Sequence, residues 1–323
     1  MDETELLDPW PGRITPDFLV SGPGEPPVTF YERYCGRATV LVFAPDAAAL
    51  AALRALADSH QVVGILPREA VGDPGFPAVA DDGRLAEACL GRRAGEAPVA
   101  LVLRPTLTLE ARLEAPTIQM IRAVLERIPA PTEQRLEGCA PVLVVPDVLP
   151  APLCARLIAV HDADNFESGV WRPAGDKVAL VPDPAVKQRR DHRLVDRELV
   201  EAVTAALEAR LMPAIARAFH YPVTKLESYK VVAYDAATGG YFRPHRDNTT
   251  PDARHRRFAL TLNLNTDYAG GELVFPEFGA GLYRPPAGGA LVFSGTLLHA
   301  AREVTAGRRY VLLTFLWGDE VEA

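Results

Sequence analysis

The chain has 323 residues, of which 48% are hydrophobic and 24% are charged, and its net charge at pH 7 is −8. Such proportions are typical of folded proteins, and a length above about 250 residues favours two domains over a single core. The negative charge argues against general nucleic-acid binding, and no apolar run approaches the roughly 20 residues that span a bilayer. We therefore expect two globular domains, with neither nucleic acid nor a membrane as a partner.

Cysteine spacing and the first residues bear on the compartment. The four cysteines, Cys35, Cys89, Cys139 and Cys154, are far apart and show no paired spacing. This is typical of reduced thiols rather than of a disulfide framework or a zinc site. The opening stretch MDETELLDPWPG is acidic and lacks the charged-then-apolar pattern of a signal peptide. Together these features predict a cytoplasmic protein.

The first half alternates between strand-like and helix-like segments. Buried-strand patterns are short apolar runs, whereas the helical ones show apolar residues three and four apart. The expected elements are a strand at 38–45, a helix at 46–60 that begins with a capping Asp46, a strand at 61–67, a strand or hairpin at 99–113, and an amphipathic helix at 115–128. This order predicts a small α/β domain with a largely parallel central sheet.

A Pro-rich, polar linker is expected at 129–141, and helical spacing returns at 149–163 and 196–219. From Lys225 the pattern changes to short strands separated by turn residues: KLESYKVVAYD, YFRPHRD, RRFALTLNLN, GELVFPE, ALVFSG, LLHAAREVT and RRYVLLTFLW. Such spacing predicts an antiparallel sandwich or barrel, with the helices supporting one face.

Two side chains in YFRPHRDN, His245 and Asp247, are spaced to share one face of a strand. His299, in SGTLLHAAREVTAGRRY, is the other histidine of the strand-rich region in a comparable setting. Two imidazoles and one carboxylate form the facial triad of non-haem Fe(II), although zinc accepts the same ligands. A satisfied surface turn would be the better interpretation of His245 and Asp247 alone.

Arg309 stands ten residues after His299, with the turn-forming residues TAGR at 305–308 between them. We expect a hairpin that places Arg309 on the neighbouring strand, within reach of the same cavity. A buried arginine on an apolar strand needs an anion, and guanidinium binds carboxylates in bidentate fashion. A dicarboxylate cosubstrate would supply that anion.

In these residues the chain resembles the 2-oxoglutarate/Fe(II) dioxygenases, and more narrowly their prolyl 4-hydroxylase-like branch. The shared pattern is YFRPHRDN, RRFALTLNLN, GGELVFPEFG and GGALVFSGTLLHAAREVTAGRRY, in that order, within roughly 141–318. The resemblance implies a double-stranded β-helix (jelly-roll) domain at 141–323, O2 as co-reactant, and Fe(II) and 2-oxoglutarate as cofactor and cosubstrate, with ascorbate as a further candidate.

The same resemblance assigns roles to individual residues. It implies that Fe(II) binds to His245, Asp247 and His299, and that Arg309 holds the distal carboxylate of 2-oxoglutarate. Tyr234 would lie beside the cosubstrate, and Asn263 would stand where some relatives carry a tyrosine on that carboxylate. Related halogenases replace the metal-binding carboxylate with a small residue, so the retained Asp247 favours hydroxylation.

The N-terminal half, 1–130, resembles a thioredoxin-like or peroxiredoxin-like domain. The stretch DPWPGRITPDFLV at 8–20 has the look of a redoxin opening, and ATVLVFAP would be the central strand. A redoxin carries its nucleophilic cysteine just after that strand, where this chain has PDAAA at 45–49. We therefore expect a redox-inactive scaffold or docking platform, with homodimerisation through a sheet edge as an option.

Three functions remain open from the sequence. The first is hydroxylation of a prolyl or other residue in a peptide or protein, the second is hydroxylation of a free amino acid or small metabolite, and the third is metal holding by a non-catalytic binding protein. The basic runs at 187–191 and 253–257 are either a solvated face or the rim of the active-site mouth, where they would steer a substrate. Trp171 would either stack on a substrate or serve packing.

Overall fold

The computed structural model describes residues 11–20, 26–70, 73–92, 95, 97–133, 135, 138–174 and 177–319, and it gives no side chains within 171–179. The chain divides into two compact units, Pro9–Gln134 and a second that continues from Arg135. Part of the expected redoxin-like opening, residues 8–10, lies outside the described residues. Among the helices of the described ranges, none combines the length and apolar composition needed to cross a membrane.

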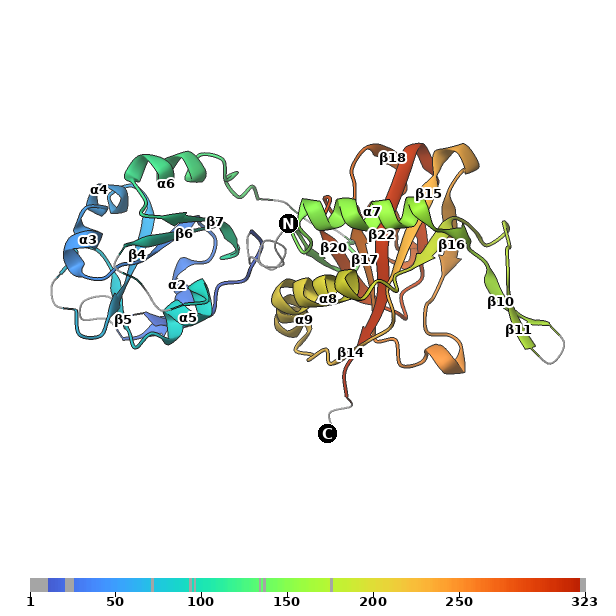
Figure 1. Ribbon diagram of the computed structural model, residues 1–323, viewed down its shortest axis with the longest axis horizontal. Coiled ribbons are helices and arrows are strands. Elements are labelled where there is room, and N and C mark those ends of the chain that lie inside the picture. Colours follow the sequence, from blue (N-terminus) through green and yellow to red (C-terminus); the bar gives the residue numbers. More distant parts are fainter. Residues whose placement is uncertain are drawn as a thin grey trace. The chain divides into compact units, whose positions relative to one another are not determined.

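The N-terminal unit is an α/β unit with helices packed on a central sheet (Figure 1). Its elements are β1 (Leu19–Val20), β2 (Val28–Thr29), α2 (Phe30–Tyr34), β3 (Thr39–Phe43), α3 (Ala47–Ala51), α4 (Arg54–Ala57), β4 (Gln61–Pro67), β5 (Ala78–Asp81), α5 (Arg84–Leu90), β6 (Val99–Leu103), β7 (Leu109–Glu114) and α6 (Ile118–Leu125).

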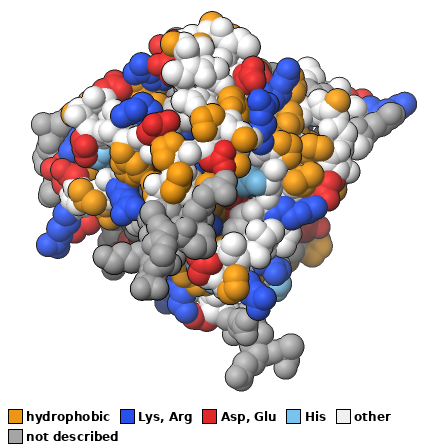
Figure 2. Space-filling view, turned by 90° about the vertical axis from the view of Figure 1, so that its right-hand side faces the viewer, with side chains coloured by type: hydrophobic (Ala, Val, Ile, Leu, Met, Phe, Trp, Pro, Cys, Tyr) orange, Lys and Arg blue, Asp and Glu red, His pale blue; other side chains and the backbone are white. Residues whose placement is uncertain are grey.

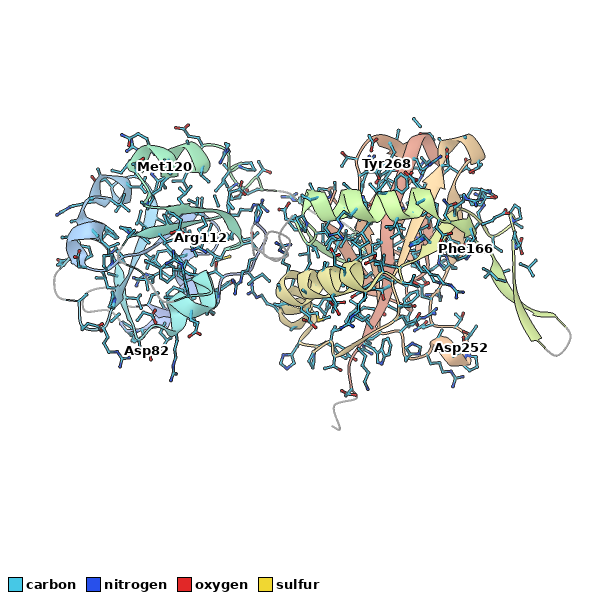
Figure 3. All side chains as sticks on the ribbon, viewed as in Figure 1. Asp82, Arg112, Met120, Phe166, Asp252 and Tyr268 are labelled. Carbon is cyan, nitrogen blue, oxygen red and sulfur yellow. The ribbon has the colours of Figure 1, made fainter. Side chains whose placement is uncertain are left out.

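Local sequence accounts for several of these boundaries. The side chain of Asp46 accepts a hydrogen bond of 2.8 Å from the amide of Ala49, which confirms the predicted cap. The single helix expected at 46–60 is instead two short ones, α3 and α4. Helix α6 is amphipathic as predicted, since it buries Ile121 and exposes Met120, which Figure 3 labels on its outer side.

The central sheet has the order β5-β4-β3-β6-β7, and its pairing corrects the expectation of a largely parallel sheet. Strands β3, β4 and β5 are parallel, whereas β6 is antiparallel to both β3 and β7. The tight connection at 104–108 joins β6 to β7 as a hairpin, and a hairpin forces antiparallel pairing. All residues of β3 and β6 are buried, because helices and loops cover both faces of the sheet.

The second unit is rich in short strands. Its elements up to the middle of the unit are β8 (Leu143–Val145), α7 (Ala151–Ala163), β9 (Phe166–Glu167), β10 (Val170–Ala174), β11 (Lys177–Val181), β12 (Lys187–Gln188), β13 (Arg190–Arg193), α8 (Arg197–Ala206), a π-helical turn (Leu207–Leu211), α9 (Met212–Phe219), β14 (Lys225–Leu226) and β15 (Lys230–Asp235). There follow β16 (Tyr241–His245), β17 (Phe258–Asn263), β18 (Tyr268–Gly270), β19 (Leu273–Val274), β20 (Ala290–Ser294), β21 (His299–Ala301) and β22 (Val304–Trp317), with 3-10 turns at Ala236–Thr238, Pro251–Ala253 and Pro276–Phe278.

Two antiparallel sheets form the jelly-roll-like core of this unit. The larger has the order β8-β20-β17-β22-β15-β13-β9 and the smaller the order β12-β16-β21-β19. One apolar cluster fills the space between the sheets, and another lies between the larger sheet and the helices. Every residue of β17 is buried, because this strand faces the helices on one side and the smaller sheet on the other.

Helices α7, α8 and α9 lie on one face of the larger sheet, as the helix-then-strand order predicted (Figure 1). The long helix expected at 196–219 is continuous but contains the π-helical turn between α8 and α9. On the other side of this unit, the hairpin of β10 and β11 extends outward (Figure 1). Trp171 lies on β10, and because its side chain is not described, the two interpretations of this residue stay open.

Candidate metal centre and cosubstrate pocket

The three predicted metal ligands meet on the smaller sheet. His245 is the last residue of β16 and His299 the first of β21, and the antiparallel register of these strands places the two histidines directly opposite each other. Asp247 follows two residues after β16 ends, and its amide donates a 2.9 Å hydrogen bond to the carbonyl oxygen of Gly295. This contact turns the chain so that the carboxylate faces both imidazoles.

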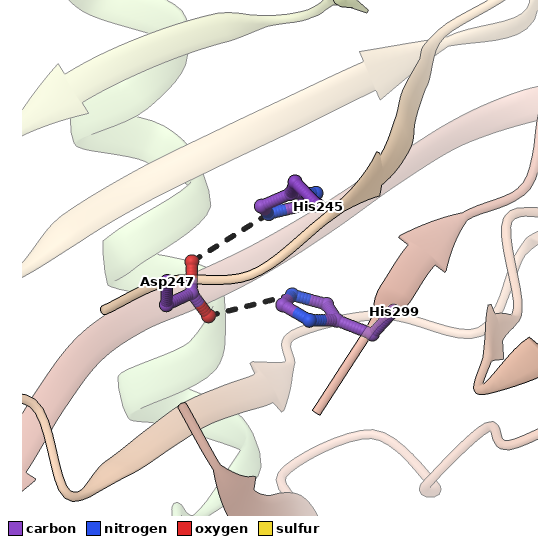
Figure 4. A group of neighbouring side chains, drawn as sticks. All are labelled: His245, Asp247 and His299. Carbon is purple, nitrogen blue, oxygen red and sulfur yellow. Dashed lines mark ion pairs between the residues drawn. The ribbon is translucent and has the colours of Figure 1, made fainter. Parts of the chain in front are cut away.

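The ligand atoms converge on one point (Figure 4). Nε2 of His245 lies 3.5 Å from Oδ1 of Asp247, and Nε2 of His299 lies 3.4 Å from Oδ2. Two ligands at right angles on a metal at about 2.1 Å are themselves about 3 Å apart, so small shifts suffice for coordination. These three residues are the one such group of histidine, cysteine and acidic residues found in the described part of the chain.

Backbone contacts orient both imidazoles for metal binding. Nδ1 of His245 lies 2.8 Å from the carbonyl oxygen of Arg243, and Nδ1 of His299 lies 3.0 Å from that of Leu297. A carbonyl oxygen only accepts hydrogen bonds, so each Nδ1 carries the proton and each Nε2 presents a lone pair toward Asp247. The repeated contact gives both histidines the tautomer that a metal ligand requires.

The protonation states also suit a cation. Burial lowers the pKa of His299 below its usual value, although the charge of Asp247 opposes this shift. Burial alone would raise the pKa of Asp247, but its position beside His245 and His299 holds it below its ordinary value. A neutral imidazole beside an ionised carboxylate is the state in which these groups bind metal.

Aromatic rings support the two histidines. The ring of Phe242 stacks on His245 with centroids 3.5 Å apart, and that of Phe293 meets His299 edge-on at 4.6 Å. Neither ring was predicted as part of the site from the sequence. Phe242 could have been recognised from its place on the same predicted strand as His245, whereas Phe293 comes from β20 and depends on the packing of the sheets.

A cavity of about 100 Å³ extends from the ligands into the space between the sheets. Figure 2 shows the face of this unit that lies at the right of Figure 1, where Lys and Arg side chains lie near a histidine at the surface. Among the residues that line the cavity, the aromatic and aliphatic ones are Tyr234, Phe242, Ala259, Leu260, Leu273, Phe293, Ala301, Leu313 and Phe315. The mixture of an apolar wall with a few directed polar groups is typical of small-molecule sites.

Arg309 lies in this cavity and is 2% exposed. Its Nε and Nη2 donate hydrogen bonds of 3.3 and 3.1 Å to Oδ1 of Asn263. Asn263 is held in turn by hydrogen bonds from its Nδ2 to Tyr268 and to the carbonyl oxygen of Pro285. Among the described residues no carboxylate lies within 4.0 Å of this guanidinium. A buried cation with only a neutral partner suits an anionic ligand, as predicted.

Arg309 reaches the cavity by a route different from the one expected. Residues 305–308 form no turn, because β22 begins at Val304 and runs through them, paired with β18. His299 lies on the smaller sheet and Arg309 on the larger one, so the two are not neighbours in a hairpin. Gly307, with a φ of +70°, lets the strand continue where the sequence suggested a reversal.

Tyr234 stands between two arginines. The guanidinium of Arg309 lies 5.5 Å and that of Arg189 5.9 Å from the centroid of its ring, and Nη1 of Arg189 donates a 3.1 Å hydrogen bond to its hydroxyl. Arg189 is itself paired with Asp191 at 3.0 Å, and Asp191 accepts from Ser168. This buried network aims the Tyr234 side chain into the cavity, beside the predicted cosubstrate position.

For Arg189 the interpretation as a solvated face is wrong, because this residue is 8% exposed and lines the cavity. The pKa of Arg189 stays above its usual value, since the nearby Tyr234 and Asp191 outweigh the effect of burial. In the second basic run, Arg256 donates a 3.1 Å hydrogen bond to the carbonyl oxygen of Asp247 and pairs with Glu227 at 2.6 Å. Both runs therefore contribute to the site. One sequence signal could have indicated this arrangement. Residues two apart on a strand point to the same side, and this spacing is shared by Lys187, Arg189 and Asp191.

Lys187 is a second partly buried cation of this run, and it lies over the ring of the cavity-lining Phe242. Its Nζ lies 5.1 Å from the centroid of the Phe242 ring. Burial and the charge of Arg189 lower its pKa from 10.5 to about 8. Between these two values the unfolded chain binds more protons than the folded protein, so stability rises with pH through this window. Below it, both states carry the charge, and the folded state bears the full cost of burying it.

We expect Lys187→Met to increase the free energy of unfolding of the metal-free protein at pH 7. The variant should also lose the increase in stability that the wild type gains between pH of about 8 and 10.5. Urea unfolding followed by tryptophan fluorescence at several pH values measures both effects. Lys225→Met is the matched control, because Lys225 pairs with the exposed Asp319 away from the cavity. A pH dependence identical in Lys187→Met and wild type would show that Lys187 is not the titrating group.

Comparison with known proteins finds a family model that matches the part of the chain that carries this site. Residues 229–317, which include the three converging ligands and Arg309, match the model of the 2OG-Fe(II) oxygenase superfamily. A PKHD-type hydroxylase of Synechococcus sp. is 28% identical over 182 residues, which are 54% of this chain and 77% of that protein. A PKHD-type hydroxylase of Xanthomonas axonopodis pv. citri is 28% identical over 196 residues, with 56% and 79% covered.

A solved structure, that of a prolyl-4-hydroxylase of Pseudomonas putida, is 21% identical with a TM-score of 0.42, and the match covers 55% of this chain and 93% of that one. The sequence comparisons show that the chain carries a 2OG-Fe(II) oxygenase domain with PKHD-type, prolyl 4-hydroxylase-like relatives. It is an enzyme of the dioxygenase class, and its cofactor and cosubstrate are Fe(II) and 2-oxoglutarate. The resemblance noted in the C-terminal sequence is thereby confirmed.

Proposed function

We propose that the enzyme hydroxylates a prolyl or other residue in a peptide or protein, with Fe(II) on His245, Asp247 and His299. The observation that carries the assignment of the site is the joint presence of three converging ligands and a buried arginine that lacks an ionic partner among the described residues. The printed name of the relatives, PKHD-type hydroxylase, supports the reaction type. A free amino acid or small metabolite is the alternative substrate class. The family match sets aside a non-catalytic binding protein.

Bound Fe(II) together with 2-oxoglutarate supplies the oxidising power by which O2 converts a substrate C–H bond to C–OH while the keto acid becomes succinate and CO2. The chain's own residues bind and orient. Arg309 would take the distal carboxylate of 2-oxoglutarate in two hydrogen bonds, and Asn263 holds the guanidinium in the plane that this requires. Tyr234, fixed by Arg189, would border the cosubstrate, and the apolar wall would exclude water.

An anaerobic titration tests this assignment most directly. Metal-free protein would receive Fe(II) and then 2-oxoglutarate while the visible absorption spectrum is recorded. We expect the charge-transfer band of a chelated keto acid, because both the metal ligands and the anchor for the distal carboxylate are in place. The His299→Ala protein is the matched control and should give no band. Iron uptake by the wild type without a band would contradict the role of Arg309 and indicate a structural metal.

A substitution at Gly271 tests the role of Arg309 without replacing the arginine itself. Its φ is +72°, and a Cβ at this position would lie 2.9 Å from Cδ of Arg309. We expect Gly271→Ala to displace the arginine and to raise the 2-oxoglutarate concentration for half-maximal succinate formation by roughly 10-fold, since overpacking a filled site costs about 1–3 kcal/mol.

Gly239→Ala is the control for Gly271→Ala, because Gly239 has a φ of +68° but no atom within 4 Å of its Cβ position. It shares the backbone strain of the test variant without the clash. Equal cosubstrate requirements in the two variants would show that displacement of Arg309 is not the cause.

For the N-terminal unit we propose a redox-inactive thioredoxin-like scaffold. Its support is the sequence after β3, where Asp46 caps α3 and no cysteine is present. Cys89 is buried in α5, and burial raises its pKa to about 12, so it is a protonated thiol at neutral pH. Thiol-dependent peroxide consumption or disulfide reduction by the full chain, lost on Cys35→Ser or Cys89→Ala, would contradict the proposal.

A further inference from the structure

Most charged groups around the cavity have a partner of opposite sign. Arg189 is paired with Asp191 at 3.0 Å, and Arg256 with Glu227 at 2.6 Å. Lys230 also lines the cavity, but no carboxylate within 4.0 Å of its ammonium and no hydrogen-bond acceptor is found for it among the described residues. An ammonium group facing an apolar cavity without a partner carries a desolvation cost that an anionic ligand would remove.

Strand register separates Lys230 from the predicted cosubstrate anchor. Lys230 and Tyr234 lie on the same face of β15, and their partners on β22 are Leu313 and Arg309. At about 3.3 Å per residue, four residues place the two positions roughly 13 Å apart along the sheet. A dicarboxylate of five carbons that chelates the metal and reaches Arg309 therefore has no carboxylate left for Lys230.

Arg256 connects the part of the cavity beside Lys230 with the candidate metal ligand Asp247. Arg256 lies 3.9 Å over the ring of Phe315 and donates to the carbonyl oxygen of Asp247. Phe315 is two residues beyond Leu313, the partner of Lys230. Lys230 thus lines the same cavity as the proposed ligands, from the larger sheet, while His245 and His299 line it from the smaller one. A substrate must occupy this space to be oxidised.

The charges of the site with Fe(II) and 2-oxoglutarate bound indicate whether that substrate is an anion or a cation. The two charges of Fe(II) and the one of Arg309 would be balanced by Asp247 and the two carboxylates of 2-oxoglutarate. Arg189 and Arg256 are neutralised by their own partners. Lys230 is then left as the cation without a counter-charge at the cavity wall. Burial lowers its pKa below the usual value; Asp191 and Glu227 oppose this shift, while Arg189 and Arg256 add to it.

We propose that Lys230 binds a carboxylate of the primary substrate, so that the enzyme hydroxylates an organic acid close to its carboxylate. The inference rests on the proposed Fe(II) and 2-oxoglutarate site. The carboxylate belongs either to a small amino-acid-like molecule or to an acidic side chain or C-terminus of a peptide, and both sources share the same contact with the ammonium.

The test compares acids with their neutral amides on the protein loaded anaerobically with Fe(II) and 2-oxoglutarate, where binding occurs without turnover. The probe pairs are acetate and acetamide, N-acetyl-L-proline and its amide, and the capped tripeptides Ala-Pro-Asp and Ala-Pro-Asn. Ligand-observed NMR and calorimetry give the dissociation constants. In at least one pair we expect the acid to bind about 10-fold more tightly than the amide, as for a charge-assisted hydrogen bond in a shielded site.

Variants identify the group responsible. Lys230→Gln should reduce the preference for the acid to less than about 2-fold, and Lys230→Glu should reverse it. Lys225→Gln, which removes a lysine paired with Asp319 at the surface, should keep the wild-type preference. If the small acid pair shows the preference, the substrate is of the free-acid class; if only the tripeptide pair shows it, the substrate is a peptide.

Three results would overturn the inference: no acid preference in any pair, a preference that survives Lys230→Gln, or weakened 2-oxoglutarate binding in Lys230→Gln, which would assign the lysine to the cosubstrate. The absorption band of the chelated keto acid, recorded before each titration, separates these results from a failure of the proposed function. Without that band in the wild type, the proposed site itself is wrong and the inference falls with it.

Discussion

His299→Ala is expected to lower succinate formation from 2-oxoglutarate by more than about 100-fold. This loss is larger than the one that follows when a residue that only hydrogen-bonds to a metal ligand is substituted. The substitution removes one of three ligands, and the two that remain, His245 and Asp247, would hold the metal weakly. Nε2 of His299 lies 3.4 Å from Asp247, and this residue is only 5% exposed. A side chain from the protein surface therefore cannot take its place as a ligand. The measurement is succinate release together with the iron content of the protein after gel filtration.

The fold should survive this change, because His299 is the first residue of the short strand β21 and its neighbours Phe293 and Phe275 can partly fill the space. Circular dichroism and the unfolding midpoint check this point. His60→Ala, in the other unit, serves as the control and should retain full turnover. Undiminished succinate production by His299→Ala would show that the triad is misassigned.

Arg309→Ala is expected to raise the 2-oxoglutarate requirement by roughly 150- to 4,000-fold, since leaving a buried charge without its partner costs about 3–5 kcal/mol. The maximal rate should fall less than this requirement rises, because the metal ligands stay in place. The side chain has Asn263 as its hydrogen-bonding partner, at 3.1 and 3.3 Å, so the substitution leaves no carboxylate unpaired in the free protein. Succinate formation measured over a range of 2-oxoglutarate concentrations gives both quantities.

Arg308→Ala is the matched control for Arg309→Ala. Arg308 is the preceding residue on β22, its side chain is 47% exposed, and it pairs with Asp235 on the opposite side of the strand. We expect its 2-oxoglutarate requirement to stay within about 2-fold of wild type. A wild-type requirement in Arg309→Ala would mean that another group holds the distal carboxylate.

Several features of this protein follow from local sequence. The Asp46 cap, the amphipathic α6 and the buried run of β3 depend on interactions within a few residues, and the structure confirms each of them. The spacing of His245 and Asp247, together with the motifs that follow around His299 and Arg309, resembled the pattern of one family, and residues 229–317 match the model of that family.

Other features depended on contacts that no local pattern encodes. Residues 305–308 resemble a turn, but pairing with β18 makes them part of β22, and the tolerance of Gly307 for positive φ lets the strand pass. Strand pairing between distant segments also made the N-terminal sheet mixed. In each case, hydrogen bonds to a strand far along the chain outweighed the local propensity.

The sequence by itself indicated the class of enzyme, because the proposed metal ligands His245, Asp247 and His299 and the proposed anchor Arg309 stand in motifs that resemble one family. The tertiary structure alone decided which charges around them are neutralised. Arg189 and Lys230 both read as ordinary basic residues, yet Arg189 is buried against Asp191 and Tyr234, whereas Lys230 faces the cavity without a partner among the described residues. The burial and the ion pairing of each charged side chain depend on strands that meet only in the folded sheet. Burial and pairing together determine whether a charge is neutralised within the protein or is left to bind a ligand.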